Sequence, residues 1–182
     1  MRSLLVMTVI GQDKPGLVES VADLVAQHRG NWLESRMSRL GGQFAGILRV
    51  EVPAENEKAL VLSLQALGSR GLAVVVHSDQ AKVEHPPGRL RILEIVGHDR
   101  PGIVRQISHA LASYGVNVEE LQTECASAAM TGETLFKARA KLRVPDLADV
   151  EQIRRNLERI ASDLIVDVSF AESETEEPLS RI

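Results

Sequence analysis

Residues 10–18 of the chain read IGQDKPGLV, and residues 96–104 read VGHDRPGIV. Five of the nine positions are identical, and three of the other four keep their chemical character. The two stretches lie 86 residues apart, and the offset is 92 residues at Phe44 and Phe136. The second copy therefore contains six more residues than the first between these points. The chain is therefore an internal duplication, and each half should fold as one copy of the same small domain.

An apolar run precedes each copy of this stretch, and a helical pattern follows it. Leu4–Ile10 and Leu90–Val96 are mostly apolar and are followed by glycine, which is typical of buried central strands. Beyond each loop, apolar residues recur at positions i, i+4, i+7 and i+8, a spacing that places one apolar face of a helix on a sheet. These residues are Leu17, Val21, Leu24 and Val25 in the first copy, and Ile103, Ile107, Ala110 and Leu111 in the second.

The remaining elements also occur in pairs. Gly41-Gly42 predicts a tight hairpin in the first copy, and Ala126–Glu133 predicts a longer one in the second. The patterns predict second strands at Asn31–Leu40 and Asn117–Cys125, third strands at Phe44–Val52 and Thr134–Val144, second helices at Glu55–Leu67 and Leu147–Ile160, and fourth strands at Leu72–His77 and Leu164–Phe170. Each half thus has the order βαββαβ, and we expect an α+β protein of two tandem ferredoxin-like domains.

The domain boundaries follow from composition. A polar, proline-rich run at residues 80–88 reads as a linker between a first domain at residues 1–79 and a second domain at residues 89–170. Residues 171–182 are acidic and contain too little apolar material to pack, so we expect a disordered tail.

Composition argues against nucleic-acid binding and against one class of enzyme. The 182 residues carry a formal net charge of -4, with Lys and Arg scattered along the chain, so no surface for DNA or anionic membranes is expected. RNA-binding domains of this topology stack bases on aromatic residues of the central strands, whereas Leu4–Ile10 and Leu90–Val96 contain none. Acyl-phosphate hydrolases of similar topology hold a phosphate in the first loop, where Asp13 or Asp99 would repel it.

The few reactive side chains show no catalytic or metal-binding pattern. Cys125 is the single cysteine and cannot form an internal disulfide, which is compatible with a reducing cytoplasm. The five histidines have no metal-ligand spacing with one another or with Cys125. Leu4–Ile10 is too short to cross a bilayer, and no targeting segment is visible. We therefore expect a cytoplasmic protein with no metal, no cofactor, no catalytic residues and no membrane association.

The repeated loop is the candidate ligand site. In the first copy, Gly11 should let the chain turn off the strand, Pro15 should take the first helical position, and Gly16 should leave the first helical N–H groups open. The helix dipole favours a carboxylate there by about 0.3 to 1 kcal/mol, as an amino acid would provide. Asp13 would either fix the loop or accept the ammonium of the same ligand. A simple helix start is the alternative, but both copies retain the whole loop, which favours a functional site.

Asn31 and Asn117 are a further shared pair at the start of the second strands. Each could end the preceding helix as a left-handed residue or contact a ligand, and the two roles are compatible. The candidate ligand-binding residues are Gly11, Asp13, Pro15, Gly16, Leu17 and Asn31 in the first half, and Gly97, Asp99, Pro101, Gly102, Ile103 and Asn117 in the second.

These residues resemble the ACT domain family, whose members show a strand, a loop of the form Gly-x-Asp-x-Pro-Gly-[Leu/Ile]-[Val/Leu], a helix, and an Asn that opens the second strand. The resemblance implies domains that pair, bind amino acids through that loop and helix start, and regulate associated proteins. It implies here a homo-oligomeric regulator that senses a small amino acid, such as glycine or serine, and acts through a protein partner. A regulatory subunit of an amino-acid biosynthetic enzyme and a purely structural pairing module remain open alternatives.

Overall fold

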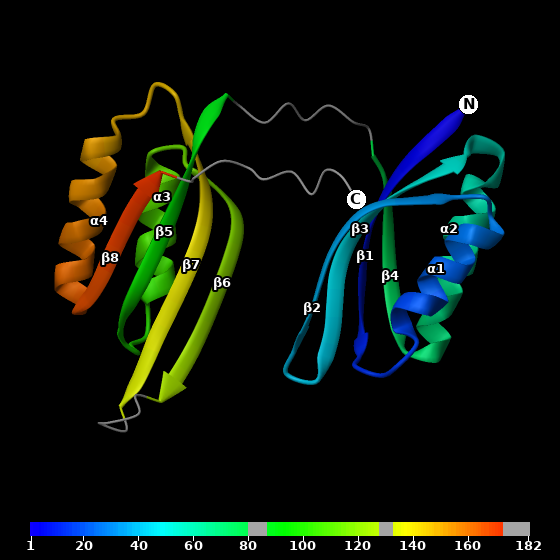
Figure 1. Cartoon of the computed structure of the whole chain (residues 1–182), viewed down its shortest axis with the longest axis horizontal. Coiled ribbons are helices and arrows are strands. Elements are labelled where there is room, and N and C mark those ends of the chain that lie inside the picture. Colours follow the sequence, from blue (N-terminus) through cyan, green and yellow to red (C-terminus); the bar gives the residue numbers. More distant parts are fainter. Residues whose placement is uncertain (80–86, 128–132, 173–182) are drawn as a thin grey trace. The chain divides into compact units, whose positions relative to one another are not determined.

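The structure is a computed structural model, which describes residues 1–79, 87–127 and 133–172. The chain forms two compact units, Met1–Val83 and Glu84–Ile182 (Figure 1). Each unit has a four-stranded antiparallel sheet with its helices on one face, in the order βαββαβ. The predicted α+β class and the tandem ferredoxin-like arrangement are therefore confirmed.

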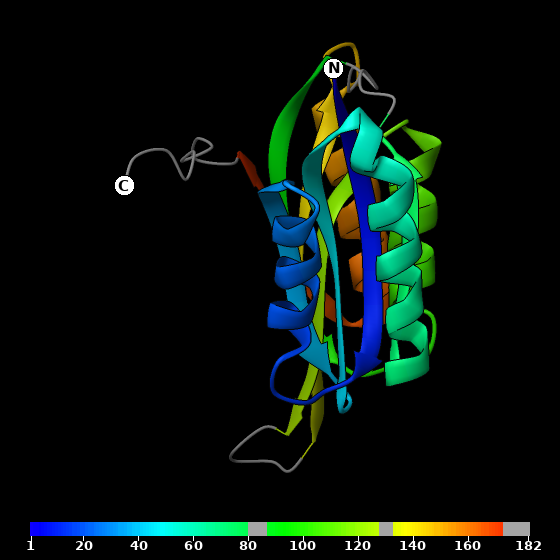
Figure 2. The ribbon, with the colours of Figure 1, turned by 90° about the vertical axis from the view of Figure 1, so that its right-hand side faces the viewer.

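The first unit has the strand order β2-β3-β1-β4, so β1 and β3 are central. Its helices lie side by side against one face of the sheet (Figure 2). The elements are β1 (Arg2–Gln12), α1 (Leu17–Gln27), β2 (Asn31–Leu40), β3 (Gln43–Pro53), α2 (Glu57–Ala66) and β4 (Leu72–Ser78), with the 3-10 turns η1 (Ala54–Asn56) and η2 (Leu67–Arg70) on either side of α2.

The second unit has the equivalent order β6-β7-β5-β8. Its elements are β5 (Gly88–His98), α3 (Ile103–Ser113), β6 (Asn117–Ser127), β7 (Thr134–Pro145), α4 (Val150–Leu164) and β8 (Val166–Glu172).

Alternation along the central strands builds each core. In β1, Leu5, Met7 and Val9 are almost fully buried and face α1 and α2, while the residues between them face the other side of the sheet. Leu93 and Ile95 of β5 take the equivalent places in the second core. Burial of each such side chain contributes about 1.5 to 3 kcal/mol, so the apolar runs of the sequence determine which face of each strand meets the helices.

The hairpin between β2 and β3 matches its prediction. Gly41 and Gly42 form the two-residue turn and have φ values of 57° and 77°. Positive φ at both central residues is the requirement of a type I′ turn, which glycine meets without strain.

Helix α4 begins later than the pattern predicts. It starts at Val150, whereas the prediction placed its start at Leu147, which is fully exposed. Asp149 sets the start, because its Oδ1 accepts a hydrogen bond from the N–H of Gln152 at 3.0 Å.

Helix α4 also ends later than predicted. It continues past Ile160 to Leu164, which had been assigned to the last strand. Leu164 is 7% exposed and completes the buried face of the helix, and Ile165, with a φ of 56°, then ends it. Strand β8 therefore begins at Val166.

Sheet pairing reaches into both predicted non-domain segments. Strand β5 begins at Gly88, opposite Pro145, and β8 continues to Glu172, opposite Arg91. The predicted linker and tail therefore each contribute residues to the second sheet. Outside the described residues lie 80–86 of the predicted linker, 128–132 of the predicted second hairpin and 173–182 of the predicted tail.

Candidate functional site

The loop between β1 and α1 brings the predicted residues Asp13 to Leu17 together at one end of the first unit. Gly16 is the N-cap of α1, with a φ of 88°, and its carbonyl accepts hydrogen bonds from the Ser20 N–H at 2.9 Å and the Ser20 hydroxyl at 2.8 Å. The loop of the second unit is built alike: Gly102 has a φ of 97°, and its carbonyl accepts from the Gln106 N–H at 3.0 Å.

This geometry corrects the predicted role of the prolines. Helix α1 begins at Leu17 and α3 at Ile103, so Pro15 and Pro101 do not occupy the first helical position. In each loop a glycine in the left-handed conformation follows the proline, and the helix begins at the next residue. The glycine is needed for its backbone conformation, because residues with a side chain rarely adopt such φ values.

Gly11 and Gly97 also have a different role from the predicted turn. Both lie inside strands that continue to Gln12 and His98. A Cβ on Gly11 would lie 2.4 Å from the carbonyl oxygen of Gly71, and a Cβ on Gly97 would lie 2.6 Å from a methyl group of Val166. These glycines therefore permit close approach of the neighbouring strand.

Asp13 is held by the β2–β3 hairpin. Its Oδ2 lies 2.6 Å from Nε of Arg39 in β2, and its N–H donates to the carbonyl of Gly42 at 2.9 Å. The N–H of Asp99 makes the equivalent bond to Thr134 at 3.0 Å. In the first unit, the loop-fixing role predicted for this aspartate thus has defined partners on the β2–β3 hairpin.

Asn31 and Asn117 lie away from the loops of their own units. Asn31 pairs with Glu51 on β3, whereas Gly11, next to the loop, pairs with Phe44 on the same strand. Asn31 and the loop are therefore about 23 Å apart along the strand direction. Neither asparagine ends a helix, and that predicted role is wrong. The left-handed residues that follow α1 and α3 are Arg29 and Gly115, with φ values of 58° and 69°.

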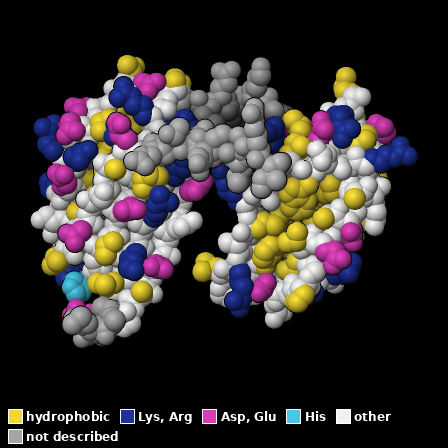
Figure 3. All heavy atoms as spheres, viewed as in Figure 1, with side chains coloured by type: hydrophobic (Ala, Val, Ile, Leu, Met, Phe, Trp, Pro, Cys, Tyr) yellow, Lys and Arg dark blue, Asp and Glu magenta, His cyan; other side chains and the backbone are white. Residues whose placement is uncertain are grey.

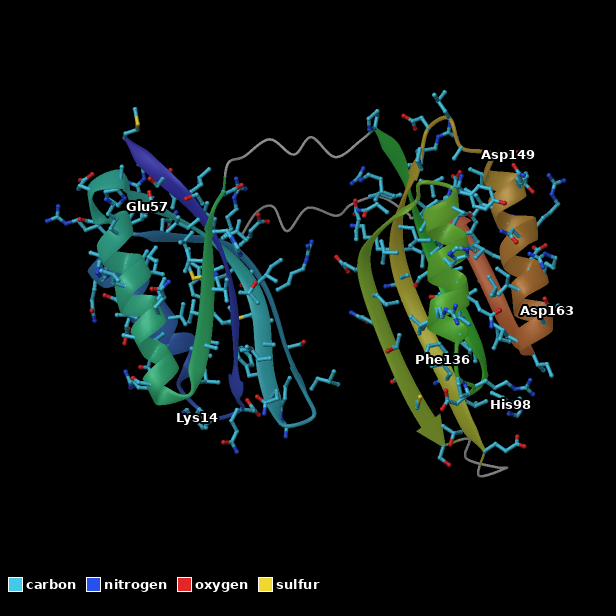
Figure 4. The ribbon with its side chains drawn as sticks, turned by 180° about the vertical axis from the view of Figure 1, so that it is seen from behind. Lys14, Glu57, His98, Phe136, Asp149 and Asp163 are labelled. Carbon is cyan, nitrogen blue, oxygen red and sulfur yellow. The ribbon has the colours of Figure 1, made fainter. Side chains whose placement is uncertain are left out.

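A polar pocket of about 260 Å³ lies beside the loop of the first unit. Figure 4 shows Lys14 at this end of the unit, below the end of α2. The Lys14 Nζ donates to the backbone carbonyl of Arg70 at 3.0 Å, which joins the loop to η2. The pocket is lined by Lys14, Pro15, Gly16, Leu17, Glu19, Ser20, Leu67, Arg70 and Leu72.

The pocket continues into a groove between α1 and α2. This second hollow, of about 400 Å³, shares Glu19, Ser20, Leu67 and Arg70 with the first and extends along α1 to Asp23 and Gln27. Glu19 and Arg70, which line both hollows, are not among the residues predicted from the sequence. Glu19 could have been found as an acidic residue in the first turn of the helix, whereas Arg70 reaches the loop only through the fold.

The second unit carries different charges at the equivalent positions. At the constant offset of 86 residues, Arg105 replaces Glu19 and His109 replaces Asp23. Leu72 and Val166 are equivalent because they pair with Gly11 and Gly97, so Leu164 stands where Arg70 does. The two loops therefore share a backbone and differ in electrostatics.

The second unit has an apolar hollow between its sheet and α3. Its volume is about 30 Å³, room for little more than a water molecule, and it lies where Val118 replaces Trp32. Within the described ranges, no three His, Cys, Asp or Glu side chains lie close enough to hold a metal ion. Of the helices that the structure describes, none is long and apolar enough to cross a membrane.

Comparison with known proteins gives consistent matches in both halves. Models of the ACT domain match residues 3–77 and 92–168. An unknown protein from Galdieria sulphuraria superimposes with a TM-score of 0.84 at 29% identity, covering 95% of this chain and 99% of that one. A structure named "putative glycine cleavage system transcriptional repressor" superimposes with a TM-score of 0.68 at 19% identity, over 95% and 99% of the two chains, a likeness of fold. No curated protein sequence matches the chain.

Proposed function

Because the chain belongs to the ACT domain family, with one domain in each half, we propose that it is a regulatory protein that senses an amino acid at the β1–α1 loop. The polar pocket of the first domain is the observation that carries this proposal. The pocket is lined by the N-terminal end of α1, by the cationic Lys14 and Arg70, and by the acidic Glu19.

The charges of the pocket suit an α-amino acid. The N–H groups of the first turn of α1, beginning at Leu17, have no partner within the helix and would receive the carboxylate. Lys14 and Arg70 would add positive charge at the same end, and Glu19 would face the ammonium group. Asp13, which is already paired with Arg39, would act mainly by holding the loop.

The two domains would then differ in ligand binding. Arg105 in the second domain would repel the ammonium that Glu19 attracts in the first. We propose that the first domain binds the amino acid, through Gly16, Leu17 and the pocket residues. The equivalent loop of the second domain, around Gly102 and Ile103, is then the weaker site.

For the regulated process, we propose negative regulation of glycine cleavage genes through a protein partner. The tandem arrangement resembles the glycine cleavage system transcriptional repressor, a bacterial regulator understood to act on a LysR-type activator and not on DNA. The net charge of -4 is in keeping with a partner other than DNA. Glycine or serine would be the ligand, and the protein would act in the cytoplasm without catalysing a reaction. The alternative is a regulatory subunit of an amino-acid biosynthetic enzyme.

Calorimetry with glycine, serine and the other amino acids tests the ligand. Glu19→Gln should weaken binding about tenfold, because it removes the charge that faces the ammonium. Arg105→Gln is the matched control in the second domain and should leave the affinity unchanged. No heat and no thermal stabilisation with any amino acid at millimolar concentration would refute the proposed site.

Affinity capture with the intact, tagged protein tests the partner. Recovery of a LysR-type activator would support transcriptional regulation. Recovery of an enzyme of amino-acid biosynthesis would support the alternative, and recovery of only the protein itself would favour a structural pairing module.

A further inference from the structure

The sheet of the first domain has one face covered by α1 and α2 and one open face. On the open face, side chains from three neighbouring strands form two cross-strand rows, with Thr8 of β1 between Val75 and Ile47 in one row. Ile10, between Ala73 and Ala45, forms the next row. We call these six residues the apolar block: Thr8, Ile10, Ala45, Ile47, Ala73 and Val75.

The apolar block is exposed and uncharged. Ile10, Ile47 and Val75 retain 49%, 51% and 54% of their surface. Figure 3, seen from another side, shows that hydrophobic side chains also gather elsewhere on the surface of this domain. Charged residues form the margin of the block: Arg36 of β2 stands opposite Ile47 in the first row, and in the row beyond it Arg49 pairs with Glu34 at 3.5 Å and with Asp79 at 2.7 Å. A contiguous apolar patch with a charged margin is typical of a protein interaction surface.

The second domain provides an internal comparison, because it has the same fold with a charged open face. Glu94 stands at the position of Thr8 and Arg139 at the position of Ile47, and their side chains are 3.3 Å apart. Lys137, at the position of Ala45, lies 3.4 Å from Glu124. The fold therefore tolerates charge on this face, so the apolar block of the first domain is not a requirement of the fold.

We propose that the apolar block is the contact surface of a homodimer, in which the open faces of the first domains of two copies pack against each other. An uncharged apolar surface needs an equally apolar counterpart, because charged groups buried against it would lose their hydration without compensation. A second copy related by a twofold axis presents that counterpart automatically. The open face of the β5–β8 sheet, with its ion pairs, does not.

The size of the face is adequate for such a dimer. Ten residues along a strand span about 33 Å and four strands about 19 Å, so the whole open face, which is the apolar block together with its charged margin, has about 600 Å² in projection. A standard interface uses about 800 Å² of accessible surface from each partner, and the accessible surface of a pleated face exceeds its projection. Two sheets packed in this way would lie about 10 Å apart, as in a sandwich.

The proposed dimer leaves the ligand pocket free. The pocket is formed by the β1–α1 loop, α1 and η2, on the helical side of the sheet. Dimerisation and amino-acid binding are therefore separate properties, and either could fail without the other.

A variant borrowed from the second domain tests the surface. The triple change Thr8→Glu, Ile47→Arg and Val75→Ser installs the residues that Glu94, Arg139 and Ser169 provide at the same register, so the sheet should still fold. Sedimentation equilibrium should show a dimer for the wild-type protein and a dissociation constant raised at least about 100-fold for the variant.

A control substitution on α2 tests whether the effect is specific to the apolar block. Leu62 of α2 is 68% exposed and outside the apolar block, so Leu62→Arg should leave the dimer intact. A wild-type monomer at about 100 μM, a triple variant that dimerises as tightly as the wild type, or a Leu62→Arg variant that is equally disrupted would each overturn the proposal.

A second measurement does not depend on the triple variant folding. In a Cys125→Ser background, Ile47→Cys should react with a maleimide at least about tenfold more slowly above the dimer dissociation constant than below it, because the dimer covers this position. Leu62→Cys should react at one rate throughout. A rate at position 47 that does not depend on protein concentration would count against the interface.

Discussion

Replacement of Gly16 by asparagine separates the conformational role of this glycine from its proposed role in leaving the ligand site open. Gly16 has a φ of 88°, and a Cβ built there would meet nothing nearer than the Glu19 carboxylate at 3.7 Å. The position therefore has room for a side chain but demands a left-handed backbone. Asparagine adopts that conformation more readily than other residues with a side chain, so Gly16→Asn isolates the effect of filling the space.

The expected magnitudes follow from this geometry. A left-handed conformation costs an ordinary residue about 1 to 2 kcal/mol, and asparagine less, while loss of a glycine also restricts the unfolded chain. The free energy of unfolding should therefore change by less than about 1 kcal/mol, and Tm by no more than about 4 to 8 °C. The new side chain would stand before the Leu17 N–H and displace a charge-assisted hydrogen bond, so affinity for the amino acid should fall at least about tenfold.

Thermal unfolding and calorimetry on the same preparation measure both quantities. Gly102→Asn, at a φ of 97°, is the matched control and should change stability by a similar amount without altering the main binding event. Gly16→Val would be less informative, since a β-branched residue at positive φ is strained and loss of fold would mimic loss of binding. Unchanged affinity in a stable Gly16→Asn protein would show that the carboxylate does not approach this end of α1.

Three further outcomes are expected. Gly11→Ala should destabilise the first domain by about 1 to 3 kcal/mol in urea unfolding, because its Cβ would lie 2.4 Å from the Gly71 carbonyl; a neutral effect would contradict the close-approach role. Arg91→Leu should be neutral or stabilising within about 1 kcal/mol in the same assay, because Arg91 is 6% exposed with an unpartnered Nε, and Leu5 fills the equivalent position of the first core; a large loss would show that the Arg91–Glu172 pair is required. The purified protein should not bind promoter DNA at physiological salt in a gel-shift or fluorescence titration, because its net charge is -4, and tight binding would exclude the proposed mode of action.

The parts of the fold that could be predicted from the sequence are those that depend on local spacing of residues. Within the described residues, the duplicated motif and the periodicities identified each α-helix and each strand, because burial on one face imposes a regular spacing on the sequence. Leu164 shows where this fails: an apolar residue before Val166 fits either a helix face or a strand, and only the left-handed turn at Ile165 decides between them. Arg70 shows a second limit. Its place beside the loop depends on the packing of η2 against that loop, where Lys14 bonds to the Arg70 carbonyl, and no local pattern contains that information.

The roles of the glycine and proline residues in the repeated loop could be assigned only from the structure. Sequence reasoning attributed Gly11 to a turn and Pro15 to the first helical position, which are the commonest uses of these residues near a helix start. In the structure, Gly11 avoids a backbone collision, and the helix begins only after the left-handed Gly16. A turn and a close approach of two strands both require glycine at position 11, so the identity of the residue alone could not distinguish these two roles.

This distinction changes what the duplication says about function. Retention of the loop in both halves first favoured a ligand site, yet Gly16 and Gly102 share a left-handed φ that the fold requires, whatever the loop binds. Agreement between the halves therefore reports mainly on the backbone. Functional information lies where two nearly identical backbones carry different chemistry, as at Glu19 and Arg105 beside the loops. Exchange of these two charges, Glu19→Arg together with Arg105→Glu, should therefore weaken amino-acid binding at the first site in calorimetry, because a positive charge would then face the ammonium group.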